Sequence, residues 1–212
     1  VCERCTALGA KVVMQCLDVR NTNALRSWLD EVCKTEALDL VIINAGMNTN
    51  IGLAGEGEPW DEVEALLDIN LKAGMAMVHA VLPAMRQRGR GQIALVSSLA
   101  GYFGLPVTPS YCASKAALKA YGEALRGWLA PEGIRVNVIM PGYVESPMCD
   151  AMPGPKPFLW QPAKAARFIQ RGLARDKARI SFPFPLNLGT WFLAVLPAAV
   201  SLRILSLLGY RG

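Results

Sequence analysis

The sequence predicts an α/β protein with a doubly wound parallel sheet, in which helices cover both faces. Short apolar runs rich in Val and Ile alternate along the chain with longer segments of helical periodicity. These runs lack a polar–apolar alternation, as is typical of parallel strands buried on both faces. The chain has 212 residues, 52% of them apolar and 18% charged, which is enough for one domain with a sizeable core.

The first half of the chain contains two predicted strands and two predicted helical segments. We expect a strand at 11–19 (KVVMQCLDV) and a helix at 21–36, where apolar residues follow helical spacing. A second strand is expected at 38–46, because a short continuous apolar run ends there in NAG. Residues 58–89 should form one long helix or two abutting helices.

The second half repeats the same alternation. Residues 91–98 (GQIALVSS) predict a buried strand, and a loop rich in Gly and Pro leads from it to a helix at 111–131. We expect a further strand at 134–142, a helix at 161–175 and a last strand at 177–182. This order predicts parallel strands joined by helical crossovers.

The last segment, 186–212, is unusually apolar and close in length to a membrane-spanning helix. Pro197, Ser201 and Arg203 interrupt the apolar run. Three interpretations stay open: a helix that docks on the core or forms a dimer, a helix in the plane of a membrane surface, and a true span. We therefore expect a domain at 1–185 and an apolar helical tail, packed on that domain or on a membrane surface, at 186–212.

The charge and cysteine patterns argue against several classes of function. The net charge is +5, but the densest basic run, 86–91, is too short for a nucleic-acid surface, so no nucleic-acid partner is expected. Six cysteines are scattered without the spacing of a disulfide framework, which favours a reduced, cytoplasmic compartment. Cys2 and Cys5 form a CxxC without a second pair, and His79 is the only histidine, so no metal site is expected.

Tyr111 and Lys115 lie four residues apart near the start of a predicted helix, so they share one helix face. This spacing alone is equally typical of an ordinary solvated helix. However, Ser98 lies thirteen residues before Tyr111, at the end of a predicted strand, and Asn70 lies forty-one residues before it. The carboxyl ends of the strands form the edge where ligands bind in open α/β sheets. The four residues are therefore candidates for one site.

In order and spacing, the motifs around these residues resemble those of the short-chain dehydrogenase/reductase family over residues 8–182. The motifs are NAG (44–46), DINLKAG with Asn70, VSSLAG (96–101), YCASK (111–115) and PGYVESPM (141–148). The resemblance implies a Rossmann-like sheet and an NAD(P)-dependent oxidoreductase that interconverts an alcohol and a ketone or aldehyde by hydride transfer.

The resemblance also implies a role for each catalytic candidate. Tyr111 would be the general acid/base, and the neighbouring Lys115 ammonium would lower the pKa of its phenol, which is near 10 in free tyrosine. Ser98 would hold and polarise the substrate oxygen. Asn70 would hold a water that links Lys115 to solvent.

The same resemblance assigns residues to the cofactor. Asp18 would meet the adenine region, and the turn Asn44–Gly46 would lie beside a ribose, where glycine allows close approach. Tyr111 and Lys115 would reach the nicotinamide end, with Lys115 on the ribose hydroxyls. The remaining candidates are Ala45, on the same turn, and, near the nicotinamide, Pro141, Gly142, Val144 and Ser146, the last at a position where relatives often carry Thr.

The chain departs from the family pattern at one point, because it contains no TGxxxGxG phosphate-binding loop. By motif order, the sheet is expected to lack its first two strands, as in an N-terminally truncated fragment, and the chain alone is then expected to bind cofactor poorly or to be inactive. If 11–19 is a strand, it either pairs directly with 38–46 or is left without a partner. The choice between NAD and NADP stays open, with NADP slightly favoured by the basic balance.

Two further expectations concern partners. The Pro-rich segment 148–161 carries aromatic residues and is interpreted either as a cover over an apolar small-molecule substrate or as an ordinary loop. A homodimer or homotetramer is expected by analogy with the family. The alternative function is a truncated or retired family member that acts as a binding or membrane-associated module without catalysis.

Overall fold

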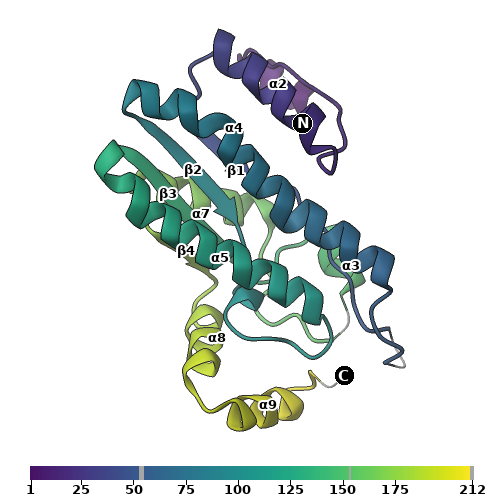
Figure 1. Ribbon diagram of the computed structural model, residues 1–212. Coiled ribbons are helices and arrows are strands. Elements are labelled where there is room, and N and C mark those ends of the chain that lie inside the picture. The colour runs from purple at the N-terminus through teal and green to yellow at the C-terminus, as the bar shows by residue number, and fades with distance from the viewer. Residues whose placement is uncertain (53–54, 153, 211–212) are drawn as a thin grey trace.

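A computed structural model describes residues 1–52, 55–152 and 154–210, so residue 153 of the predicted segment 148–161 and residues 211–212 of the tail lie outside the described residues. The described chain contains a four-stranded sheet, all parallel, in the order β1-β2-β3-β4 (Figure 1). The strands are β1 (Leu40–Ile43), β2 (Gly91–Val96), β3 (Ile134–Pro141) and β4 (Arg179–Phe182). The predicted α/β class, with parallel strands, is confirmed.

Helices cover both faces of this sheet. The long helices α4 (Ala73–Arg88) and α5 (Pro109–Leu129) lie on one face, and α7 (Pro162–Ala174) lies on the other (Figure 1). Successive side chains of a strand point to opposite faces of a sheet. In β2, Ile93 and Leu95 accordingly pack in the cluster that contains α4 and α5, whereas Ala94 packs with α7 on the other face. Helix α2 (Thr22–Thr35) packs on α4 through Leu25 and Leu29. The shorter helical elements are α1 (Cys2–Ala7), η2 (Leu99–Gly101), η3 (Ala130–Glu132) and α6 (Pro147–Ala151).

The segment predicted as one long or two abutting helices is continuous from Trp60 to Arg88. It consists of α3 (Trp60–Leu67), a π-helical turn η1 (Asp68–Lys72) and α4. By length and hydropathy this helix could cross a membrane. Nevertheless, Val78, Val81 and Met85 are buried in the core cluster that joins α4 to the sheet and to α2. It therefore packs here as a core helix of a folded domain.

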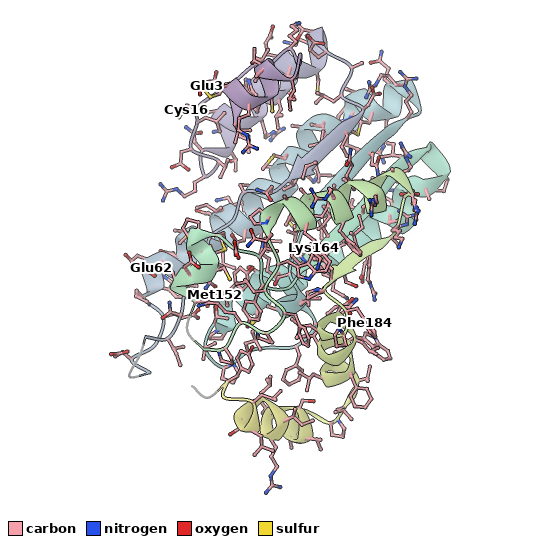
Figure 2. All side chains as sticks on the ribbon, turned by 180° about the vertical axis from the view of Figure 1, so that it is seen from behind. Glu3, Cys16, Glu62, Met152, Lys164 and Phe184 are labelled. Atoms are coloured by element: carbon pink, nitrogen blue, oxygen red, sulfur yellow. The ribbon has the colours of Figure 1, made fainter. Side chains whose placement is uncertain are left out.

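The strand predicted at 11–19 is wrong, because these residues form no regular element and pair with no strand of the described chain. Val13 and Met14 are 71% and 74% exposed, and Figure 2 shows Cys16 at the periphery of the molecule. A strand is stable only when its backbone pairs with a neighbour. Of the two outcomes expected for this segment, the unpaired one is observed. Leu40 and Ile42 of β1 are exposed as well.

The single apolar C-terminal helix that the sequence predicts is instead two helices, α8 (Leu186–Val195) and α9 (Ala198–Leu207). Leu196 is extended with ψ 156°, and Pro197 follows it. Proline has no N–H and disfavours helical backbone in the residue before it, which explains the break. The tail lies at the end of the sheet where α5 begins (Figure 1). Most of its large apolar side chains are exposed, and Phe184, just before the tail, projects outward in Figure 2.

Candidate active site

The candidate catalytic residues meet at the carboxyl edge of the sheet. Ser98 lies two residues after the end of β2, and Asn70 lies in the π-helical turn before α4. Tyr111 and Lys115 lie on the first two turns of α5, whose N-terminal end reaches the same edge (Figure 1). Because the strands are parallel, their carboxyl ends open onto one crevice, and helices that start there direct their N-termini at it.

Tyr111, Ser98 and Lys115 share this crevice. The Lys115 Nζ lies 5.6 Å from the centroid of the Tyr111 ring and donates a 3.0 Å hydrogen bond to the carbonyl oxygen of Val96. The Ser98 hydroxyl accepts from the backbone N–H of Ala100 at 3.1 Å, so it also caps a turn at the end of the strand. The side chains of Ser98 and Lys115 therefore both lie next to that of Tyr111.

Burial dominates the protonation of the two titratable groups. Burial raises the pKa of the Tyr111 phenol above 10, and a side-chain hydrogen bond with Ser98 opposes this shift. Burial lowers the pKa of the Lys115 ammonium from 10.5 to about 8. The expected lowering of the Tyr111 pKa by Lys115 is therefore not observed. The reason is physical: both side chains are more than nine-tenths buried, and burial disfavours the charged form of each.

Asn70 connects the turn after β1 to α5. Its side-chain oxygen accepts from the Met47 N–H at 2.8 Å, and its amide group donates to the Met47 carbonyl at 2.9 Å and to the Ser114 hydroxyl at 3.0 Å. The π-helical turn aims this buried amide at the site. Asn70 thereby fixes the backbone next to Gly46 relative to the helix that carries Tyr111.

The N-terminal end of α5 is anchored by residues that sequence reasoning missed. The Glu58 carboxylate accepts from the Ser110 N–H at 3.1 Å, from the Ser110 hydroxyl, and from the Thr49 hydroxyl at 2.6 Å. The buried Thr108 hydroxyl donates to the Thr49 carbonyl at 2.7 Å. Thr108 followed by Pro109 is a local signal for a helix start. Nothing local indicates Glu58, which lies 52 residues from Ser110.

Among the cofactor candidates, Gly46 lies beside Asn70 and Lys115. A Cβ atom at this position would lie 3.3 Å from Asn70 Oδ1 and 3.4 Å from Lys115 Nζ, so a larger residue would crowd both side chains. Asn44 and Ala45 precede it, directly after β1. Asn44 is exposed at the sheet edge and Ala45 is partly buried.

The candidates at the end of β3 and just after it are held by several parts of the chain. Pro141 accepts a long hydrogen bond, 3.5 Å, from the Ser98 hydroxyl. Gly142 is packed so closely that a Cβ atom would lie 2.9 Å from Pro183, just before the tail. Val144 forms an isolated bridge with Trp160. The Ser146 hydroxyl caps α6 by accepting from the Cys149 N–H at 3.1 Å.

Asp18 is the candidate that the described structure does not bring to the other residues. It lies in an exposed turn, where its carboxylate pairs with Arg20 at 2.7 Å. The side-chain hydrogen bond from Arg20 lowers the pKa of the Asp18 carboxyl. Because 11–19 forms no strand, the position at a strand end that was expected for Asp18 does not exist here.

The donors around Lys115 fit a nicotinamide ribose. An ammonium has three N–H groups, and the hydrogen bond to Val96 uses one of them. Gly46, which has no side chain, lies beside the same ammonium. Diol hydroxyls are suitable acceptors for the remaining N–H groups. No cluster of three or more metal-ligating side chains occurs in the described residues.

Comparison with known proteins identifies the family. A family model for short chain dehydrogenases matches residues 1–154. The chain belongs to the short-chain dehydrogenase family. An uncharacterized oxidoreductase of Myxococcus xanthus is 36% identical over 192 residues, covering 90% of this chain and 75% of that protein. The ketoacyl reductase HetN of Nostoc is 34% identical over 144 residues, covering 68% of this chain and 50% of HetN.

Solved structures agree with this assignment. A short chain dehydrogenase from Burkholderia cenocepacia, determined in complex with NADP, is 25% identical with a TM-score of 0.76, and the match covers 93% of this chain and 80% of that one. The fold is therefore the Rossmann-like fold of this family. The chain is an oxidoreductase-family protein, and the matches span between 50% and 80% of the three proteins named.

Proposed function

We propose that the protein is an NAD(P)-dependent oxidoreductase that interconverts an alcohol and a ketone or aldehyde. The observation that supports this best is the grouping of the Tyr111 phenol, the Ser98 hydroxyl and the Lys115 ammonium in one crevice, with Asn70 behind them. Reduction of a carbonyl needs a proton donor at the carbonyl oxygen, a group that polarises this oxygen and a hydride donor.

In the direction of reduction, Tyr111 donates the proton. Burial keeps its phenol neutral at physiological pH, so the proton is present to be given. The Ser98 hydroxyl donates a hydrogen bond to the substrate oxygen and stabilises its developing charge. Lys115 stabilises the phenolate that remains, and Asn70 holds the neighbouring backbone in place. A bound nicotinamide supplies the hydride.

The nicotinamide half of the cofactor would be held by Asn44–Gly46, Tyr111, Lys115, Pro141, Gly142, Val144 and Ser146. NADP is slightly favoured over NAD. The basic net charge supports this preference, and the Burkholderia relative was determined with NADP. The direct test is isothermal titration of both nucleotides, with tighter binding of NADP as the expected result.

The substrate is proposed to be a small carbonyl compound with an apolar part. A cavity of about 510 Å³ lies beside the site, and it is lined by Leu105, Cys112 and Ala116 among other mostly apolar residues. The relative HetN is named a ketoacyl reductase. These features favour ketones with alkyl or aromatic groups over sugars.

Two further proposals concern assembly and location. Helices α4 and α5 are expected to form a homodimer or homotetramer interface, and the cytoplasm is the proposed compartment. Peripheral membrane contact through 186–212 is supported by Trp191, Phe192 and Leu207, which are 44%, 53% and 79% exposed. Sedimentation with anionic vesicles tests this contact, and Trp60→Ser, at another exposed tryptophan, is the matched control for Trp191→Ser.

The experiment for the main proposal is consumption of NADPH with a panel of ketones and aldehydes. Tyr111→Phe removes only the hydroxyl and is expected to lower turnover by at least about a thousandfold, within the range that loss of a catalytic acid produces. Tyr121→Phe makes the same change on another face of α5 and should retain activity. Equal turnover in the two variants would exclude the role proposed for Tyr111.

The alternative is a non-catalytic binding or membrane-associated module. The exposed apolar surface of α8 and α9 favours it. It predicts vesicle binding together with no nucleotide binding and no turnover of any carbonyl tested.

A further inference from the structure

Tyr143 lies near Tyr111 and belongs to the motif PGYVESPM, but no role is assigned to it above. It comes directly after Gly142, beyond the end of β3. The phenols of Tyr111 and Tyr143 both lie within electrostatic reach of the same two thiols, Cys112 and Cys149. Burial, reinforced by a hydrogen bond with Tyr210, raises the pKa of Tyr143, so its phenol is neutral.

Tyr210 reaches Tyr143 from the C-terminal part of the chain. It follows α9, and its side chain is 8% exposed. Its hydroxyl lies 3.0 Å from the Tyr143 hydroxyl and donates to the Pro155 carbonyl oxygen at 3.0 Å. A phenol hydroxyl can donate once and still accept, so one Tyr210 hydroxyl satisfies both contacts. It thereby holds two points of the segment that leads from β3 to α7.

The base of this segment is held independently. The Trp160 N–H donates to the Tyr143 carbonyl at 3.0 Å, and the Glu145 N–H donates to the Trp160 carbonyl at 3.0 Å. The Trp160 ring stacks on Phe182 of β4 with ring centroids 5.0 Å apart. These contacts fix the base of the segment to the sheet. At Pro155, away from this base, Tyr210 supplies a hydrogen bond from the tail.

The tail also contributes to the neighbouring cavity. Leu202 of α9 lines the 510 Å³ cavity together with Cys112 of α5. Cys112 is thus a shared neighbour of the cavity and of both phenols. The tail therefore touches the site region at two places, Leu202 of α9 and Tyr210 beyond it.

We infer that Tyr210 is a positioning residue that holds Tyr143 and Pro155 in place as one wall of the substrate pocket beside Tyr111, and so determines which carbonyl substrates fit. This inference rests on the proposed function for its substrate, a carbonyl compound with an apolar part. Tyr210 itself is not expected to touch the reacting atoms. Its removal should therefore change substrate selection more than the chemical step.

The test compares Tyr210→Phe, which keeps the ring, with Tyr121→Phe, which makes the same change at a half-buried tyrosine of α5 that packs on the core. The first readout is the rate of chymotrypsin cleavage after Phe158, which is 54% exposed in the segment that Tyr210 holds. Loss of the two hydrogen bonds should accelerate this cleavage about three- to tenfold. Tyr121→Phe should leave the rate unchanged.

The second readout is KM and kcat for a series of ketones of increasing size. Tyr210→Phe should raise KM severalfold for the preferred large ketone and leave kcat for the smallest ketone nearly unchanged. Equal cleavage rates in Tyr210→Phe and wild type overturn the inference, as does faster cleavage with an unaltered ranking of ketones. If the wild type turns over no carbonyl, the proposed function fails, and the cleavage rates alone decide whether Tyr210 holds the segment.

Discussion

The buried ammonium of Lys115 gives the fold a stability that depends on pH. Its side chain is 4% exposed, and burial lowers its pKa from 10.5 to about 8. In the unfolded chain the pKa of a lysine stays near 10.4. Between pH 8 and 10.4 the unfolded state therefore binds more protons than the folded state. Stability must rise with pH through this window, because the energetic cost of burying the charge disappears there.

Lys115→Met isolates this contribution, because methionine fills similar space and does not titrate. The 1.5 pH units from pH 8 to 9.5, at about 1.36 kcal/mol each, amount to roughly 2 kcal/mol. We predict that the free energy of unfolding of the wild type, measured relative to Lys115→Met, increases by about this amount between pH 7 and 9.5. Urea unfolding followed by tryptophan fluorescence measures it at each pH. Staying below pH 9.5 keeps Tyr111 protonated.

Lys119→Met is the matched control, because Lys119 lies one turn further along α5, where its ammonium pairs with Glu123 at 3.1 Å. It reports the effect of removing a lysine from this helix without removing the buried one. A difference between wild type and Lys115→Met that stays constant from pH 7 to 9.5 would refute the reasoning. In that case Lys115 would not be buried as a titrating amine.

Three further changes test how the site is held. Glu58→Ala should destabilise the fold by about 1–2 kcal/mol in urea unfolding, since Ser110 loses its cap, whereas Glu62→Ala on the exposed face of α3 should not. Gly122→Ala should cost about 1–3 kcal/mol in the same assay, because its Cβ would lie 2.6 Å from Val138, and Gly127→Ala, with open space around it, should be neutral or stabilising. Gly46→Ala should reduce NADPH-dependent turnover at least tenfold with little loss of thermal stability, because the added Cβ would crowd Asn70 and Lys115. Unchanged turnover would show that the turn after β1 lies outside the site.

Local sequence pattern predicted the elements that carry the site. The helix that bears Tyr111, expected at 111–131, is found at Pro109–Leu129, and the strand expected at 134–142 is found at Ile134–Pro141. Apolar runs bounded by Gly and Pro define such elements within a few residues. The segment 11–19 failed because its strand-like composition is not enough without a neighbouring strand to pair with.

Long-range contacts explain what the sequence could not show. Tyr210 lies 67 residues from Tyr143 and Glu58 lies 52 residues from Ser110, so no window of local periodicity contains either pair. The direction of the Tyr111 pKa depends on burial, which only the folded chain determines. Spacing correctly suggested that Lys115 lies close to the phenol, but it could not weigh that proximity against the loss of solvent.

The π-helical turn Asp68–Lys72 sets the direction of the Asn70 side chain relative to the buried face of the core helix α4. Each residue advances an α-helix by about 100°. Removing one residue, such as Leu71, would let the chain from Trp60 to Arg88 close as an uninterrupted α-helix. Either the amide of Asn70 or the buried stripe of α4 would then rotate away from its partners. A single-residue insertion or deletion in this stretch therefore cannot be absorbed locally, and length variation in such proteins should concentrate in the loops on either side of it.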